Sequence, residues 1–177
     1  RDGGRMAWQV GSTNKNGYFP LNSWVAITCQ EIGFTMRAEI IWLKEQISSR
    51  TAWGSFGLPS DNKILPSWEY IELFHKGSKN LNKKGETDLS PEEFIEWTNG
   101  LWRIAPETNS NHPAPFPEKL VVRLIKLNSY KGDLILDPFM GSGTTAKVSK
   151  NLNRNYLGIE LNPEYIKIAE KRLSQDL

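Results

Sequence analysis

The chain has 177 residues, of which 38% are hydrophobic and 24% are charged, so it is long enough for one globular domain with a hydrophobic core. A single cysteine, Cys29, excludes an internal disulfide and a metal site of several thiolates, and two histidines are too few for a His-rich cluster. The net charge of +2 neither requires nor excludes nucleic acid as a partner. Because the sequence shows no run of ~20 apolar residues and no N-terminal signal, it predicts a cytoplasmic protein that does not enter a membrane.

Strand and helix patterns alternate in the first part of the chain. A Gly-rich turn leads into an apolar strand at 5–10, which is either a short N-terminal strand or part of a sheet whose earlier elements are missing from this chain. Apolar residues at helical spacing from Leu21 predict a helix that Gly33 ends. Strands are predicted at 37–44 and 68–75, and we expect them to pair as an antiparallel hairpin with a long connection.

Residues 77–111 differ from their surroundings, because lysines are interspersed there with Gly, Ser and Asn. We therefore expect three regions: strands and a terminal hairpin in 1–76, a surface insertion in 77–111, and a ligand-binding region in 112–177. Within the insertion, Ser90 followed by Pro91 and Glu93 predicts a helix start with a capping box. Residues 99–111 are predicted to be irregular.

The last third of the chain predicts a strand–loop–helix–strand–helix unit, preceded by a helix that Pro117 begins. A short apolar run predicts a strand at 133–137 with an apolar interior, as in a parallel sheet, and a second strand is predicted at 155–160. A helix is expected at 144–151 between them, and Asn162 is expected to cap a final helix. This order is typical of a βαβ unit with a trailing helix.

The connection after the first of these strands carries the strongest functional signal. The strand ends at Asp137, and Gly141 and Gly143 in the following loop allow a ligand to approach the backbone closely. The helix behind the loop offers free N–H groups and the positive end of its dipole. Glu160 follows the next strand, 23 residues after Asp137, and an acidic residue at about 20 residues commonly holds ribose hydroxyls.

The loop sequence narrows the class of ligand. G-S-G-T-T at 141–145 departs from the G-x-G-x-x-G of dinucleotide sites and lacks the G-K-[ST] of a phosphate-binding loop. A ligand with an adenosine and an amino-acid group but no pyrophosphate fits better. S-adenosylmethionine (SAM) is such a ligand.

D-P-F-M-G-S-G-T-T at 137–145 resembles the SAM-binding motif of DNA amino-methyltransferases, which methylate adenine N6 or cytosine N4. It resembles the group in which this motif lies C-terminal to the catalytic motif. Five other segments resemble the same family: G-G-R-M-A-W-Q-V, G-F-T-M-R-A-E-I-I-W-L-K, W-E-Y-I-E-L-F-H-K-G, H-P-A-P-F-P-E-K-L and N-R-N-Y-L-G-I-E-L-N-P-E-Y-I-K-I-A-E-K-R-L. The resemblance covers essentially the whole chain. It implies an α/β fold, a Rossmann-like SAM-dependent methyltransferase sheet with a terminal antiparallel hairpin, lacking its N-terminal strands.

The resemblance also implies which residues bind the cofactor. Asp137 is expected near the methionine amino group and Glu160 at the ribose. The full set that it places at SAM is Asp137, Phe139, Gly141, Ser142, Gly143, Thr144, Thr145, Glu160, His112 and Phe116.

For four of these residues a structural role explains the sequence as well. Thr144 and Thr145 are ordinary helix-start residues. Phe116 is equally suited to the entry of the following helix, and His112 to bracing its own loop.

The family's catalytic loop is expected elsewhere. In the family it contains Asp, Asn or Ser, then Pro-Pro, then an aromatic residue, and it precedes the segment that G-G-R-M-A-W-Q-V resembles. No Pro-Pro pair occurs in this sequence, so we identify no catalytic residue in the chain. The methyl-transfer step then requires a catalytic loop from another segment or from a second chain.

The insertion occupies the position of the family's target-recognition region. Four lysines at its start are candidates for contacts with DNA phosphates, or form an ordinary solvated loop: Lys76, just before the insertion, and Lys79, Lys83 and Lys84 within it. Arg103, Trp97 and Trp102 either meet bases or anchor the insertion to the core. Residues 50–55 are a further candidate for a loop on the DNA side.

The leading prediction is therefore a site-specific DNA methyltransferase, or its C-terminal SAM-binding part, which acts on double-stranded DNA in restriction–modification. It would transfer the methyl group of SAM to adenine N6 or cytosine N4 of a flipped base. The alternative is a catalytically incomplete SAM- or DNA-binding subunit that needs a partner chain. A methyltransferase for RNA or a small molecule is a third alternative, against which the lysine-rich insertion and the hairpin argue.

Overall fold

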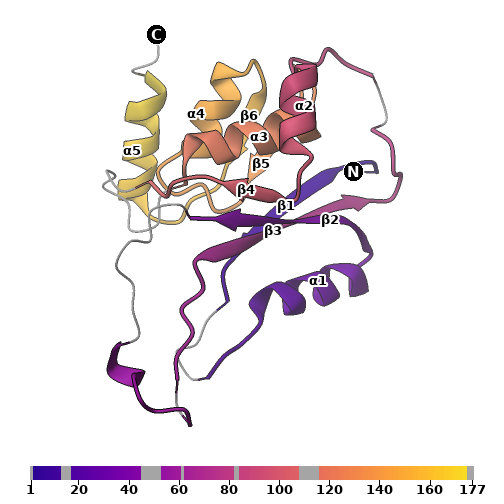
Figure 1. Ribbon diagram of the computed structural model, residues 1–177. Coiled ribbons are helices and arrows are strands. Elements are labelled where there is room, and N and C mark those ends of the chain that lie inside the picture. The colour runs from indigo at the N-terminus through magenta and orange to yellow at the C-terminus, as the bar shows by residue number, and fades with distance from the viewer. Residues whose placement is uncertain are drawn as a thin grey trace. The chain divides into compact units, whose positions relative to one another are not determined.

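The computed structural model describes residues 2–12, 17–44, 53–60, 62–81, 84–107 and 116–174, and the chain divides into two compact units (Figure 1). Unit 1 comprises Arg1–Lys79 and Gly100–Ala105, and unit 2 comprises Asn80–Asn99 and Pro106–Leu177. Each unit has a sheet of its own. No helix in the described ranges is long and apolar enough to span a membrane.

Unit 1 is built on a sheet with the strand order β1–β3–β2–β4. Its strands are β1 (Arg5–Val10), β2 (Phe34–Leu43), β3 (Trp68–Lys76) and β4 (Leu101–Arg103). β3 pairs antiparallel with β1 and with β2, which confirms the predicted hairpin. β4 pairs parallel with β2 inside the stretch that the sequence predicted as irregular, so that prediction was wrong at these three residues.

A helix, α1 (Leu21–Glu31), covers one face of the sheet of unit 1 (Figure 1). Val25 and Cys29 of α1 form a buried cluster with Phe74 of β3. Gly33 ends the helix as predicted, because its φ of 86° lies in the left-handed region that favours glycine.

Unit 2 contains the βαβ arrangement expected from the sequence. Its elements are α2 (Pro91–Trp97), α3 (Glu118–Asn128), β5 (Leu134–Asp137), α4 (Thr144–Asn151), β6 (Asn155–Gly158) and α5 (Pro163–Ser174). β5 and β6 pair in parallel, and α4 connects them. Val121 and Ile125 of α3 pack with Val148 of α4 in a buried cluster. The predicted capping box of α2 is confirmed, because Ser90 and Glu93 each accept a hydrogen bond from the other's backbone N–H.

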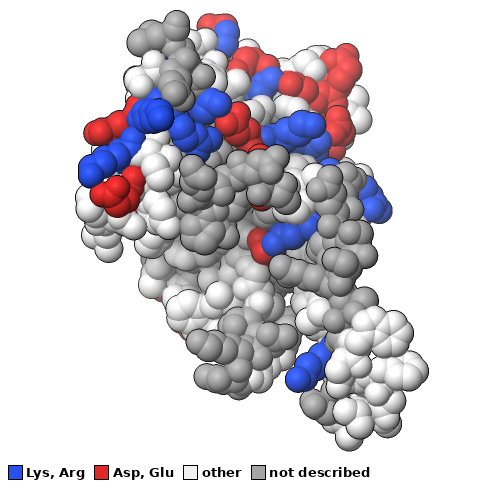
Figure 2. All heavy atoms as spheres, turned by 90° about the vertical axis from the view of Figure 1, so that its left-hand side faces the viewer, with Lys and Arg blue, Asp and Glu red and all other residues white. Residues whose placement is uncertain are grey.

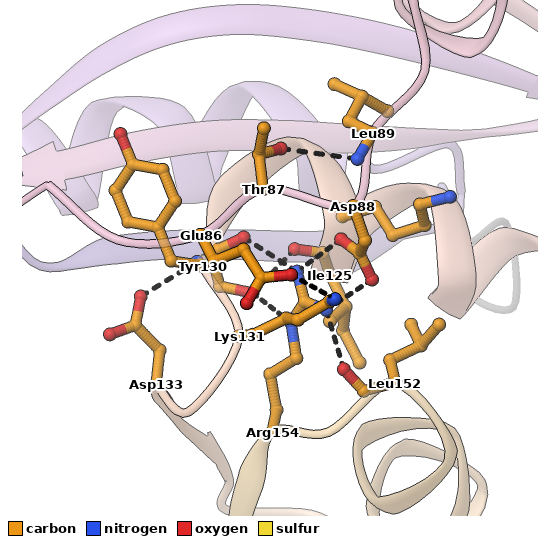
Figure 3. Close-up of polar contacts among 12 residues, drawn as sticks. Glu86, Thr87, Asp88, Leu89, Ile125, Tyr130, Lys131, Asp133, Leu152 and Arg154 are labelled. Carbon is orange, nitrogen blue, oxygen red and sulfur yellow. Dashed lines mark hydrogen bonds and ion pairs between the residues drawn. The ribbon is translucent and has the colours of Figure 1, made fainter.

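The two units do not follow the predicted boundaries after residues 76 and 111. Residues 80–99 belong to unit 2, whereas 100–105 belong to the sheet of unit 1. Figure 3 shows the main anchor of the first segment, in which the buried guanidinium of Arg154 donates to both carboxylate oxygens of Asp88, at 2.5 and 2.8 Å. This segment is therefore an integral part of unit 2 and not an independent insertion on its surface. Its role in target recognition stays a prediction.

Candidate functional site

The loop between β5 and α4 forms a tight turn at the carboxyl end of β5. Asp137 is the last residue of β5, and its Oδ1 accepts a hydrogen bond from the backbone N of Phe139 (3.0 Å). Gly141 and Gly143 have φ of 53° and 82°, a conformation that residues with a Cβ rarely adopt. Gly143 is the N-cap of α4, and no side chain caps this helix. The start of α4 therefore presents backbone N–H groups that attract a negatively charged group.

Glu160 holds the other side of this loop. Its Oε2 accepts a hydrogen bond from the backbone N of Gly141 (2.9 Å), and its Oε1 accepts one from the backbone N of Asn162 (2.8 Å). The backbone N of Ile159 donates to the carbonyl of Asp137 (2.9 Å), which keeps the ends of the two strands adjacent. The structure thus brings Asp137, Gly141 and Glu160 together at the carboxyl ends of β5 and β6.

These groups fit the polar parts of SAM. Two backbone hydrogen bonds fix the carboxylate of Glu160 at the end of β6, where an acidic residue commonly binds ribose hydroxyls. The Oδ2 atom of Asp137 has no hydrogen-bond partner among the described residues and is therefore available to an ammonium group. Phe139 is 79% exposed and offers an apolar surface beside the loop.

Arg172 in the last turn of α5 holds the same loop from inside unit 2. Its Nη1 donates to the carbonyl (2.9 Å) and to the Oγ (3.1 Å) of Ser142, and to the Oγ1 of Thr144 (3.2 Å). Glu118 at the start of α3 pairs with Arg172 (3.3 Å) and with Lys147 (3.0 Å). The hydroxyls of Ser142 and Thr144 are buried and engaged by Arg172, which favours a structural role for both side chains. The role of Arg172 was missed in the sequence: it lies in a segment that resembles the family, but its partner Ser142 is 30 residues away.

Gly143 also serves the packing of α5. A Cβ at this position would lie 2.7 Å from the Cβ of Ala169, closer than side chains approach each other. Ala169 is itself buried, so neither partner has space to move. The second glycine of the motif is therefore required by the fold as well as by the turn.

We expect Gly143→Ala to lower the free energy of unfolding of unit 2 by about 2–4 kcal/mol, because left-handed strain adds to overpacking. Gly132→Ala is the matched control, since Gly132 has a φ of 75° but no neighbouring atom within 4 Å of the place that a Cβ would take. The control should lose only about 1–2 kcal/mol, the cost of the backbone conformation alone. Urea unfolding measures both values, and equal losses in the two variants would contradict the packing argument.

The structure does not decide the roles of the remaining predicted cofactor residues. Thr145 is half-buried in the first turn of α4, and Phe116 is 37% exposed just before α3. His112 lies outside the described residues. The alternatives for these three residues, cofactor contact or local structure, therefore stay open.

The candidate DNA-binding lysines differ in how the structure engages them. Lys76 donates from Nζ to the carbonyl of Ile32 (2.6 Å) and lies over the ring of Phe34, so it is engaged in the fold of unit 1. Lys79 and Lys84 are exposed, and Lys83 lies outside the described residues. Figure 2 shows basic and acidic side chains intermingled on the face in view, not separated into a basic surface.

The aromatic residues of the predicted insertion serve the core. Trp102 of β4 is fully buried. Trp97 of α2 is buried, and the cationic groups of Arg123 and Lys126 each lie 5.4 Å from its ring centroid. Both tryptophans therefore anchor this part of the chain in the core, as one of the two alternatives predicted. Arg103, by contrast, is exposed at the end of β4.

Comparison with known proteins identifies the family. A family model described as DNA methylase, of the N6/N4 type, matches residues 1–171. The type II methyltransferase M2.DpnII of Streptococcus pneumoniae is 45% identical over 152 residues, which cover 86% of this chain and 56% of that protein. The chain belongs to the N6/N4 DNA methylase family. Members of this family use SAM as the methyl donor.

Two further comparisons agree with this family. The type II methyltransferase M.BglI of Bacillus subtilis is 36% identical over 146 residues, which cover 81% of this chain and 40% of that protein. A structure from Thermus thermophilus, described as a putative DNA modification methylase complexed with SAM, superposes with a TM-score of 0.80 at 28% identity. That match covers 99% of this chain and 70% of the other. The chain spans about half the length of the curated relatives that it matches.

Proposed function

We propose that this chain is the SAM-binding part of a site-specific DNA methyltransferase. The complete enzyme would transfer a methyl group from SAM to adenine N6 or cytosine N4 in double-stranded DNA, as part of restriction–modification. The observation that carries the proposal is the arrangement of Asp137, Gly141 and Glu160 at the carboxyl ends of two parallel strands. Type II methyltransferases among the relatives support the same activity.

The residues of this chain would bind and orient the methyl donor. SAM supplies an activated methyl group on its sulfonium. Glu160 would accept hydrogen bonds from the ribose hydroxyls, Asp137 would accept from the amino group, and the start of α4 would bind the carboxylate. Fixing the donor in this way removes much of the entropic cost of bringing it to a flipped base. In this proposal the groups that contact the target amino group come from outside the chain.

One surface of unit 2 bears on the alternative, a SAM-binding subunit completed by a partner chain. One face of the β5–β6 sheet carries exposed apolar side chains: Leu134, Leu136, Leu157 and Ile159. A segment that covers this face, from the same polypeptide or from another, would bury them. The partner chain and the cytoplasmic location both stay predictions.

Asp137→Asn and Glu160→Gln should each weaken SAM binding about 10- to 100-fold, because hydrogen bonds to charged groups contribute about 1.5–3 kcal/mol. Equilibrium dialysis with labelled SAM measures the affinity. Glu164→Gln is the matched control, since Glu164 is an exposed acid of α5 whose carboxylate pairs with Lys167. Wild-type affinity in the Glu160→Gln variant would argue against the proposed site.

A further inference from the structure

The carboxyl ends of three strands define one end of the sheet in unit 1. β1 and β2 are both antiparallel to β3, and β4 is parallel to β2, so β1, β2 and β4 run in the same direction. The register places Val10, Leu43 and Arg103 at this end, near Trp68 and Tyr70 of β3. In open α/β sheets, ligands bind beyond the carboxyl ends of the strands.

The connection between β2 and β3 begins at this end of the sheet, and its residues 53–60 lie away from the sheet (Figure 1). These residues contain a short helix, η1 (Trp53–Ser55), and two neighbouring aromatic rings that are tilted by 59° relative to each other. The ring centroids of Trp53 and Phe56 lie 5.5 Å apart, and the two residues are 71% and 78% exposed. Ser55 Oγ accepts a hydrogen bond from the backbone N of Lys63 (3.2 Å), which ties the two sides of the loop together. Large aromatic side chains are thus held together but kept out of the core.

Two of the lysines that the sequence singled out, Lys76 and Lys79, lie at the opposite end of the same sheet. Lys76 is paired with Phe34 at the amino end of β2, and its Nζ caps the end of α1. Lys79 follows three residues later, and its carbonyl accepts a hydrogen bond from Arg5 at the amino end of β1. Among the candidates in unit 1, only Arg103 lies at the carboxyl end.

We propose that Trp53 and Phe56 contact the DNA substrate, with Lys63 and Arg103 as flanking phosphate contacts; this inference rests on the proposed function. Aromatic rings stack on bases that have left the helical stack, and this contact tolerates any base. The backbone N–H of Lys63 is tied to Ser55 between the two aromatic residues, so its ammonium group is a candidate for a contact with a neighbouring phosphate. The loop would therefore support a base or base step next to the flipped target.

Fluorescence anisotropy with a labelled DNA duplex tests the assignment. The variant Trp53→Ala/Phe56→Ala should bind DNA at least ~10-fold more weakly than the wild type, because each stacked base contributes about 1–3 kcal/mol. Trp24→Ala is the matched control, since Trp24 of α1 is also an exposed tryptophan, and this variant should change the affinity less than about 2-fold. A duplex with one mismatched pair presents a partly unstacked base, so it should bind the wild type more tightly than the matched duplex, and the double variant should lose this preference.

Three results would overturn the assignment: unchanged DNA affinity in the double variant, an equal loss in Trp24→Ala, or no DNA binding by the wild type. SAM affinity, measured on the same proteins, separates this inference from the proposed function. Retained SAM binding in the double variant with lost DNA binding supports a role of the loop in DNA contact. Absence of SAM binding in the wild type would contradict the cofactor site and not the loop.

Discussion

Replacing Glu72 with Gln should raise the free energy of unfolding at about pH 8 by up to about 3 kcal/mol and flatten its pH dependence. Glu72 lies in the middle of β3, is 0% exposed, and neither carboxyl oxygen has a hydrogen-bond partner among the described residues. Burial, and to a lesser degree the charge of Glu39 directly opposite on β2, raises the pKa of Glu72 from 4.5 to about 7. A buried carboxyl in this position keeps its proton near neutral pH.

The direction of the effect follows from proton binding. Between pH 4.5 and about 7 the unfolded chain has lost the proton of Glu72 while the folded protein still holds it. Stability therefore falls as pH rises through this window and levels off above the folded-state pKa. The gap between the two pKa values corresponds to about 3 kcal/mol, at about 1.4 kcal/mol per pKa unit. Because Gln cannot ionise, the free energy of unfolding of the variant does not fall in this way as pH rises.

Urea unfolding at a series of pH values from acid to mildly alkaline measures the effect. Glu39→Gln is the control, because it removes only the lesser cause of the raised pKa and should flatten the profile by a smaller amount. A wild-type stability that stays constant across the window, or an identical slope in Glu72→Gln, would contradict the assignment of a neutral buried carboxyl.

Asp88→Ala should destabilise unit 2 by about 3–5 kcal/mol, because it leaves a buried guanidinium without its partner. The side chain of Arg154 is 0% exposed, and both of its terminal nitrogens donate to Asp88 (Figure 3). The hydrogen bond from Arg154 lowers the pKa of Asp88, so the pair loses its contribution only as pH falls below the usual value of 3.8. Asp88 therefore affects stability in a more acidic pH range than Glu72 does.

A nearby ion pair provides the control for Asp88. Glu86 lies on the same segment as Asp88 and pairs with Lys131, but the side chain of Glu86 is 70% exposed. Glu86→Gln should therefore cost less than about 1 kcal/mol, as is usual for surface pairs. Hydrogen exchange of the α3 and α4 amides reports on unit 2, and similar losses in both variants would contradict the central role of Arg154.

Local patterns predicted the elements and the candidate site well where neighbouring residues decide them. The strand ending at Asp137, the glycine turn and the strand before Glu160 form one short stretch, so their order was readable directly. The hairpin of β2 and β3 followed from strand patterns and a connecting loop. The capping box at Ser90 is likewise a signal of adjacent residues.

Features that depend on distant residues were missed or misplaced. β4 has three residues, and only its pairing with β2, some 60 residues earlier, makes it a strand. Arg154 and Asp88 lie 66 residues apart, so the sequence did not show that the segment around Asp88 joins unit 2. The burial of Glu72 likewise depends on the strands on either side of β3 and the helix over them, which its own alternating pattern does not reveal.

The central claim is that Asp137, Gly141 and Glu160 form a SAM site, and isothermal titration calorimetry of this chain with SAM tests it most directly. NAD is the competitor of choice, since it shares the adenosine but carries the pyrophosphate that the loop is not built to hold. The account predicts saturable binding of SAM with one site per chain and no measurable binding of NAD. Absence of SAM binding to a chain shown to be folded, or equal binding of NAD, would contradict it.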